Sequence, residues 1–196
     1  MDKLCNVDAW LSEIHDITVQ LHLPGPDDQV LYDMDIVDYA ILQKSKEDWM
    51  QEAMLKPKLD VYRNIKDDIN STSLVDSNLN RYKRSLLAKL ICGILPLEVE
   101  TARYDTPVPP REERYCRVCV KNLPENESHF IFDCEKLQEI RSNFYAENIE
   151  DIVDFMMKED NEKIKCLLSP AMIKAFAKLV EKLFAQRRAI LYQKNI

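Results

Sequence analysis

Apolar residues recur every three or four positions along most of this chain, a spacing typical of amphipathic α-helices. The chain has 196 residues and only two glycines, so tight hairpins and glycine-rich phosphate loops are not expected. The apolar spacing predicts helices over residues 7–22, 36–55, 59–65, 79–95, 136–145, 149–157 and 169–192. We therefore expect an all-α fold.

Start and stop residues mark the ends of several of these helices. Gly93 and Pro96 end the helix predicted over 79–95, and Ser169-Pro170 is a suitable N-cap and first residue for the last helix. The proline-rich stretch 98–114 is expected to be irregular. We divide the chain into a helical N-terminal region (1–80), a helix with a cysteine–histidine segment (81–146) and a C-terminal helical region (147–196), together forming one compact unit.

Two of the predicted helices have apolar faces that indicate how they pack. The face of the helix over 36–55 consists of Val37, Ile41, Trp49 and Ala53. The face of the last helix consists of Met172, Ile173, Phe176, Val180, Leu183 and Ile190. Both faces are expected to contribute to the core.

The N-terminus and the hydropathy pattern indicate where the protein acts. No apolar run is long enough to span a membrane, and the first residues lack the basic start and apolar core of a signal peptide. We therefore expect an intracellular protein of the nucleus or cytoplasm that does not bind membranes. In that environment its six cysteines are expected to be thiols or metal ligands rather than disulfides.

Four residues of metal-binding type follow the pattern Cys116-x2-Cys119-x9-His129-x4-Cys134. Structural zinc sites use four such ligands in a tetrahedron. Two cysteines separated by two residues can turn back on one ion, and His129 and Cys134 can lie across the turn that enters a helix. Because protein side chains fill all four positions, the pattern predicts one structural Zn²⁺ per chain and no open catalytic position.

Two other interpretations of the cysteines fit the sequence less well than a zinc site. The four residues could be buried thiols beside one hydrogen-bonded histidine, but the complete ligand set favours the metal. A redox pair is disfavoured, because no strand–helix pattern of a thioredoxin surrounds it. The remaining cysteines, Cys5, Cys92 and Cys166, lie on apolar helix faces and are expected to be small core residues.

Several segments resemble the C-terminal region of non-LTR (LINE-like) retrotransposon reverse transcriptases. The matching segments are 56–62 (KPKLDVY), 84–97 (RSLLAKLICGILPL), 100–104 (ETARY), 110–116 (PREERYC) and 125–134 (ENESHFIFDC). In that family a helix ends in Gly-x-Leu-Pro, and Glu-Glu-Arg-x-Cys-x2-Cys, Glu-x-x-His-Phe and a last Cys follow. Two residues depart from the family pattern: Ala102 replaces a usual glycine and Asp60 replaces a usual arginine.

The resemblance implies that Cys116, Cys119, His129 and Cys134 are the zinc ligands of the region that follows the polymerase domain. It also implies binding to RNA or DNA. Charge leaves room for this: the chain has a formal net charge of −7, yet residues 81–121 carry nine basic and five acidic side chains. The candidate nucleic-acid contacts are Arg81, Lys83, Arg84, Lys89, Arg103, Tyr104, Arg111, Arg114 and Arg117. The alternative is that these residues form an ordinary solvated surface.

No catalytic centre is expected. A reverse transcriptase needs a Tyr/Phe-x-Asp-Asp turn for its two metal ions, and neither Asp27-Asp28 nor Asp67-Asp68 has that context. Asp33 and Asp35 superficially match a phosphatase nucleophile motif, but the accompanying Gly-Asp pair is absent from the sequence. We expect no small-molecule substrate.

Two functions therefore remain. The first is a zinc-binding, non-catalytic tail of a retrotransposon reverse transcriptase that binds RNA or DNA. The second is a zinc-stabilised structural or protein-interaction domain that binds no nucleic acid. The placement of the two basic stretches, 81–121 and 163–196, on one face of the fold would favour the first.

Overall fold

The structure is a computed structural model that describes residues 12, 14–23, 34–66, 73–148 and 155–194. Over these residues the chain is helical without β-strands, apart from one isolated bridge between Tyr115 and Pro124. The expectation of an all-α fold is confirmed. No helix in these ranges is long and apolar enough to cross a membrane.

Along the sequence, a series of shorter helices lies between two long ones. The helices are α2 (Met34–Met54), α3 (Asp60–Ile65), α4 (Ser73–Asp76), α5 (Arg81–Ile91), α6 (Glu98–Thr101), α7 (Gln138–Glu147), α8 (Asp160–Leu167) and α9 (Ile173–Lys194). Tight 3₁₀ turns occupy Pro57–Leu59, Ala102–Tyr104, Arg111–Glu113, Glu135–Leu137 and Phe155–Met157, and a π-helical turn occupies His129–Asp133.

Most predicted helices are present, with differences at their ends. Residues 14–20 are helical, while 149–154 lie outside the described residues. Helix α9 begins at Ile173 rather than at Pro170, because Ser169 closes a turn first: its carbonyl accepts hydrogen bonds from the backbone N–H groups of Met172 and Ile173. Helix α8 was not predicted, and the stretch 98–114 contains α6 and two 3₁₀ turns.

Contacts between residues divide the chain into two compact units, Met1–Leu55 and Lys56–Ile196. This division differs from the single unit, and from the boundary after residue 80, that the sequence suggested. Val61 and Leu79 are buried in the same core as the helices that follow residue 80. Residues 56–80 therefore belong with the second unit.

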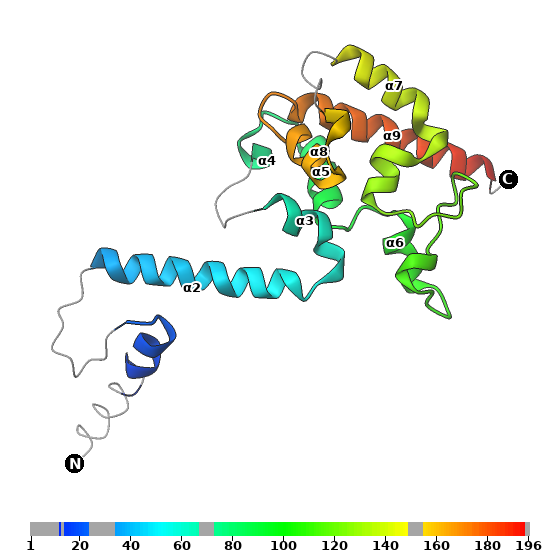
Figure 1. Cartoon of the computed structure of the whole chain (residues 1–196). Helices are drawn as coiled ribbons and strands as arrows, with labels where there is room; N and C mark the ends of the chain where they lie inside the picture. The colour runs from blue at the N-terminus through cyan, green and yellow to red at the C-terminus, as the bar shows by residue number, and fades with distance from the viewer. Residues whose placement is uncertain (1–11, 13, 24–33, 67–72, 149–154, 195–196) are drawn as a thin grey trace. The chain divides into compact units, whose positions relative to one another are not determined.

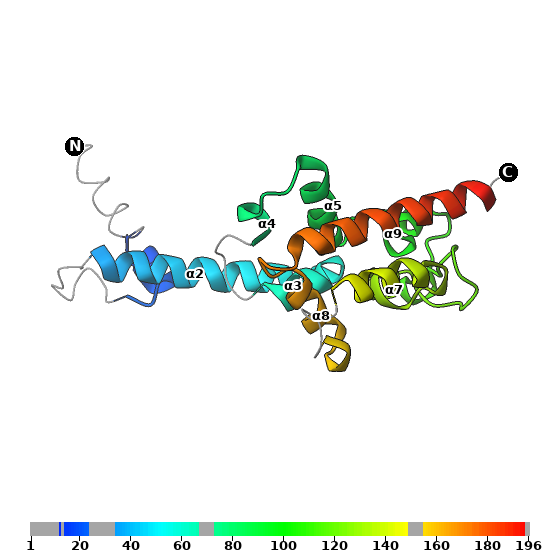
Figure 2. The same cartoon turned by 90° about the horizontal axis from the view of Figure 1, so that it is seen from above.

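Helix α9 runs through the second unit, with α5 packed along it and α7 also in contact with it (Figures 1 and 2). Five of the six residues predicted for its apolar face are buried and Ile190 is partly buried. Phe176, Val180 and Leu183 are fully buried, as are Leu87 and Leu90 of α5. Removal of this apolar surface from water supplies the main driving force for folding.

The end of α5 is fixed by Gly93, as the sequence predicted. Its φ of +62° lies in the left-handed region, which glycine adopts without strain. A Cβ at this position would lie 2.0 Å from the backbone oxygen of Lys58. Only glycine therefore lets the end of α5 approach the segment that leads into α3.

The first unit buries far less. Of its described residues only Thr18 and Ala53 are buried, and Ile41 of the predicted apolar face is 46% exposed. The predicted burial of that face is therefore wrong for Ile41. The reason lies in the sequence of α2: Ile36, Tyr39 and Leu42 are also exposed, so its apolar residues surround the helix instead of forming one stripe.

Candidate metal centre

Cys116 and Cys119 lie on a tight turn whose two arms are joined by backbone hydrogen bonds. The Cys116 N–H donates to the Leu123 carbonyl at 2.9 Å, and the Glu125 N–H donates to the Arg114 carbonyl at 3.0 Å. Asn122 completes the reversal with a φ of +49°, a conformation that asparagine tolerates better than most residues. The turn brings both thiols to the same side.

His129 and Cys134 are the first residue of the π-helical turn and the residue directly after it. The turn begins where the side chain of Asn126 accepts a hydrogen bond from the His129 N–H at 2.8 Å. It closes where the Cys134 N–H donates to the His129 carbonyl at 2.8 Å. This hydrogen bond joins residues five positions apart, whereas the hydrogen bonds of an α-helix join residues four apart. The wider turn brings Cys134 back to the side of His129.

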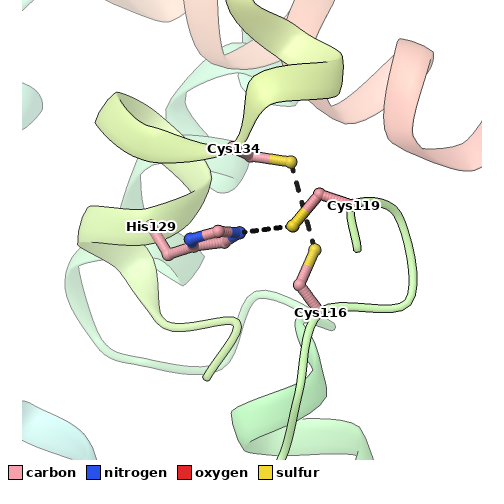
Figure 3. Close-up of side chains that lie close together, drawn as sticks. All are labelled: Cys116, Cys119, His129 and Cys134. Atoms are coloured by element: carbon pink, nitrogen blue, oxygen red, sulfur yellow. Dashed lines mark hydrogen bonds between the residues drawn. The ribbon is translucent and has the colours of Figure 1, made fainter. Parts of the chain in front are cut away.

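The four side chains converge on one point (Figure 3). All are buried, and one ligand atom from each lies within 4.8 Å of the other three. The Sγ atoms of Cys116 and Cys134 are 4.0 Å apart, and Cys119 Sγ is 3.5 Å from His129 Nε2. A tetrahedral zinc ion with bonds of roughly 2.0–2.3 Å has edges of about 3.5–3.8 Å. The cluster thus has the size that a bound metal ion requires.

The protonation of the thiols also favours a cation. Burial raises the pKa of Cys119. The hydrogen bond between Cys116 and Cys134 raises the pKa of Cys116 and lowers that of Cys134. Three neighbouring thiols cannot all ionise without a compensating charge, which a divalent metal ion supplies.

A buried carboxylate borders the cluster, and sequence reasoning did not assign it a role. Glu125 is 1% exposed and receives two hydrogen bonds from Arg187 of α9, at 2.7 and 2.6 Å. Glu125 also lies beside one of the four candidate ligands, because its Oε1 is 3.5 Å from Cys116 Sγ. The signal that could have revealed this pair is Arg187 itself, a charged residue four positions after Leu183 on the apolar face of α9.

A second arginine contacts the other side of the cluster. Arg141 of α7 is 1% exposed and donates from Nη2 to the carbonyl oxygen of Cys134. The same nitrogen donates to Gln138 Oε1 at 2.9 Å. The metal ligands are therefore connected to α7 through Arg141 and to α9 through Glu125.

The other cysteines stay apart from the cluster. Cys92 and Cys166 are free thiols of intermediate burial. Cys166 packs against the core, close to the expected role of a small core residue, whereas Cys92 is not part of the core cluster. Cys5 lies outside the described residues.

The candidate nucleic-acid residues do not gather into one free surface. Four of them pair with acids: Lys83 with Glu181 (3.2 Å), Arg103 with Glu100 (3.1 Å), Arg111 with Glu127 (3.9 Å) and Arg117 with Glu98 (3.0 Å). Two bind backbone carbonyls: Arg84 that of Leu79, and Arg114 those of Pro109 and Val99. The remaining three, Arg81, Lys89 and Tyr104, are exposed.

Comparisons with known proteins add no relative: no protein-family model, curated protein or solved structure matches this chain. The arrangement of the four ligands is therefore the observation on which a function can be built.

Proposed function

We propose that this protein is a zinc-stabilised helical module in which Cys116, Cys119, His129 and Cys134 bind one structural Zn²⁺. The observation that carries the proposal is the convergence of four buried ligand atoms within 4.8 Å. Zinc accounts for this donor set better than magnesium or calcium, because three thiolates and an imidazole suit a borderline-soft ion.

The same donor set argues for a structural role. A catalytic zinc site keeps one position for water or substrate, whereas four protein ligands fill the tetrahedron. The metal in this proposal joins the turn at 116–119 to the segment that enters α7, and both contribute buried residues to the core of the second unit. We therefore propose a module without catalytic activity.

Elemental analysis tests this proposal. The full chain, purified under reducing conditions, should contain one zinc per chain. Cys119→Ser should abolish stoichiometric zinc, since only three ligands remain. Cys92→Ser is the matched control and should retain it. A wild-type protein without zinc, also after refolding with added Zn²⁺, would disprove the metal centre.

A second candidate function follows from the resemblance to retrotransposon reverse transcriptases: the module binds RNA or DNA as the non-catalytic tail of such an enzyme. Two observations support it. The four residues that match the family's zinc ligands lie together. In addition, the basic helices α5 and α9 pack against each other, so the two basic stretches of the sequence meet in the fold.

The contact surface in this second proposal is smaller than the sequence suggested. Arg81 and Lys89 of α5 and the exposed ring of Tyr104 (75% exposed) are its best candidates. Arg114 is unsuitable as a probe, because its guanidinium is bound to backbone carbonyls and its removal would disturb the fold.

Filter binding to single-stranded RNA and DNA at low salt tests this surface. Binding should weaken steeply as salt rises, since phosphate neutralisation releases counterions. Arg81→Ala with Lys89→Ala should weaken it further, while Lys44→Ala with Lys46→Ala in α2 serves as a charge-matched control. If wild-type protein is not retained at low salt, the alternative of a protein-interaction domain replaces this function. The internal ion pairs of Arg103, Arg111 and Arg117 already favour that alternative.

A further inference from the structure

The Glu125 carboxylate connects three separate parts of the second unit. Both of its oxygens accept hydrogen bonds from Arg187 of α9, at 2.7 Å from Nε and 2.6 Å from Nη2. Oε2 also accepts the backbone N–H of Glu98, at the start of α6, at 2.8 Å. Oε1 lies 3.5 Å from Cys116 Sγ. One side chain thus contacts a metal ligand, the short helix α6 and the C-terminal helix.

The pair between Glu125 and Arg187 is both buried and bidentate. The two residues are 1% and 5% exposed and are 62 positions apart in sequence. A second carboxylate, that of Glu98, lies 3.6 Å from Arg187 and 3.0 Å from Arg117. Buried charges of this kind are retained only where their partners are well placed, so the position of Arg187 determines whether Glu125 can remain beside Cys116.

Charge balance gives Arg187 a further role. A zinc ion with three thiolates and a neutral imidazole carries a net charge of −1, and Glu125 and Glu98 add two negative charges beside it. Arg187 and Arg117 supply two positive charges, and Arg141, bound to the Cys134 carbonyl, supplies a third. Without Arg187 two carboxylates would lie next to an anionic metal centre with too few counter-charges.

We propose that Arg187 is a positioning residue for the metal centre: it holds and neutralises the Glu125 carboxylate beside Cys116, where that carboxylate would otherwise repel a zinc-bound thiolate, and it thereby makes zinc affinity depend on the docking of α9. This inference rests on the proposed zinc site. Because coupling between binding events is reciprocal, zinc in turn stabilises the docked position of α9, although no zinc ligand lies on that helix. Residues that support a metal centre from outside its ligands typically contribute 10–100-fold to the affinity for the metal.

The test measures the zinc affinity of the full chain by competition with a chromophoric chelator. Arg187→Ala should weaken affinity roughly 10–100-fold. Arg188→Ala, at the exposed neighbouring position of α9, should leave it within about twofold. Arg187→Lys retains the charge without the bidentate geometry and should lie between the two. Glu125→Gln should offset much of the loss caused by Arg187→Ala, since it removes the charge that Arg187 neutralises.

A spectroscopic measurement separates positioning from general destabilisation. With saturating Co²⁺, the thiolate-to-metal absorption of Arg187→Ala should differ from that of the wild type, whereas Arg188→Ala should match it. If Arg187→Ala does not fold, Arg187→Lys provides the same two measurements. A wild-type chain that binds no zinc would refute the metal centre itself. A wild-type chain that binds zinc, with Arg187→Ala and Arg187→Lys equal to Arg188→Ala in affinity and spectrum, would refute only this inference.

Discussion

The two compact units of this chain are both helical, yet they bury their side chains very differently. In the second unit, Lys56–Ile196, the apolar faces of α5 and α9 form a continuous core that includes Cys116, Cys119 and Cys134. In the first unit the 21-residue helix α2 leaves most of its large apolar side chains exposed. Helix length and apolar content alone therefore do not produce a core.

The difference lies in how the apolar residues are arranged. Helix α9 places Phe176, Val180 and Leu183 on one stripe, where they pack together. Helix α2 has apolar residues on all sides, since Val37 and Ile41 lie on a different side from Ile36 and Tyr39, so no single neighbour can cover them. The second unit also contains the four converging side chains of the candidate metal centre, which come from segments outside its α-helices.

Removal of the metal should produce the largest difference between the units. Apparent binding free energies of structural zinc are about 10–16 kcal/mol, comparable with the whole stability of a domain. A strong chelator under reducing conditions should therefore abolish hydrogen-exchange protection in α5 and α9. Protection in α2 should hardly change. Full protection of α9 after zinc has been removed would contradict the structural role of the metal.

A core substitution should come next in size. Phe176→Ala removes a fully buried ring of α9 and should lower the free energy of unfolding by about 3–5 kcal/mol. Tyr39→Ala removes a ring of α2 that is 64% exposed and should change it by less than about 0.5 kcal/mol. Chemical denaturation of the zinc-loaded proteins measures both. Equal losses would mean that Tyr39 is buried against a surface in solution.

A backbone substitution gives a smaller effect that is also confined to the second unit. Gly93→Ala introduces a methyl group against the Lys58 carbonyl at a positive φ and should cost more than about 1 kcal/mol. Asn122→Gly, at the other positive-φ position of this unit, should be close to neutral, because glycine adopts that conformation without strain. Thermal unfolding compares the two variants, and a neutral Gly93→Ala would show that the α5–Lys58 approach is not tight.

Deletion of the first unit should have the smallest effect of all. All four candidate ligands and the buried core cluster belong to the second unit. A chain consisting of Lys56–Ile196 should therefore bind one zinc and unfold at a midpoint within a few degrees of the full chain. Loss of zinc binding or of cooperative unfolding in this fragment would show that the two units depend on each other.

Local patterns in the sequence were sufficient for α3, α5, α7 and α9 of the second unit and for the cysteine–histidine cluster, but not for the short helices α4, α6 and α8. The spacing of Cys116, Cys119, His129 and Cys134 restricts them to one small region, because two close pairs are joined by a loop of nine residues. The apolar stripe of α9 and the end of α5 at Gly93 likewise depend on neighbouring residues. Features of this kind follow from helix geometry and side-chain chemistry alone.

What could not be predicted depends on residues far apart in the chain. Glu125 and Arg187 are individually ordinary charged residues, and only the fold brings them together beside Cys116. The same applies to Arg111 and Arg117, which appeared available for phosphate but lie beside Glu127 and Glu98. In α2 the pattern predicted a buried face that includes Ile41, which is exposed, because a helix with apolar residues on every side has no single face to bury.

The π-helical turn at His129–Asp133 determines where this chain tolerates insertions. One extra residue within 130–133 would rotate Cys134 by roughly a quarter of a turn relative to His129 and move its thiol away from the other three ligands. The nine-residue loop between Cys119 and His129 contains exposed positions, such as Val120 (77% exposed), where added residues would extend into solvent. Length variation in related sequences should therefore occur in the loop at 120–124, while the four-residue spacing before Cys134 stays fixed.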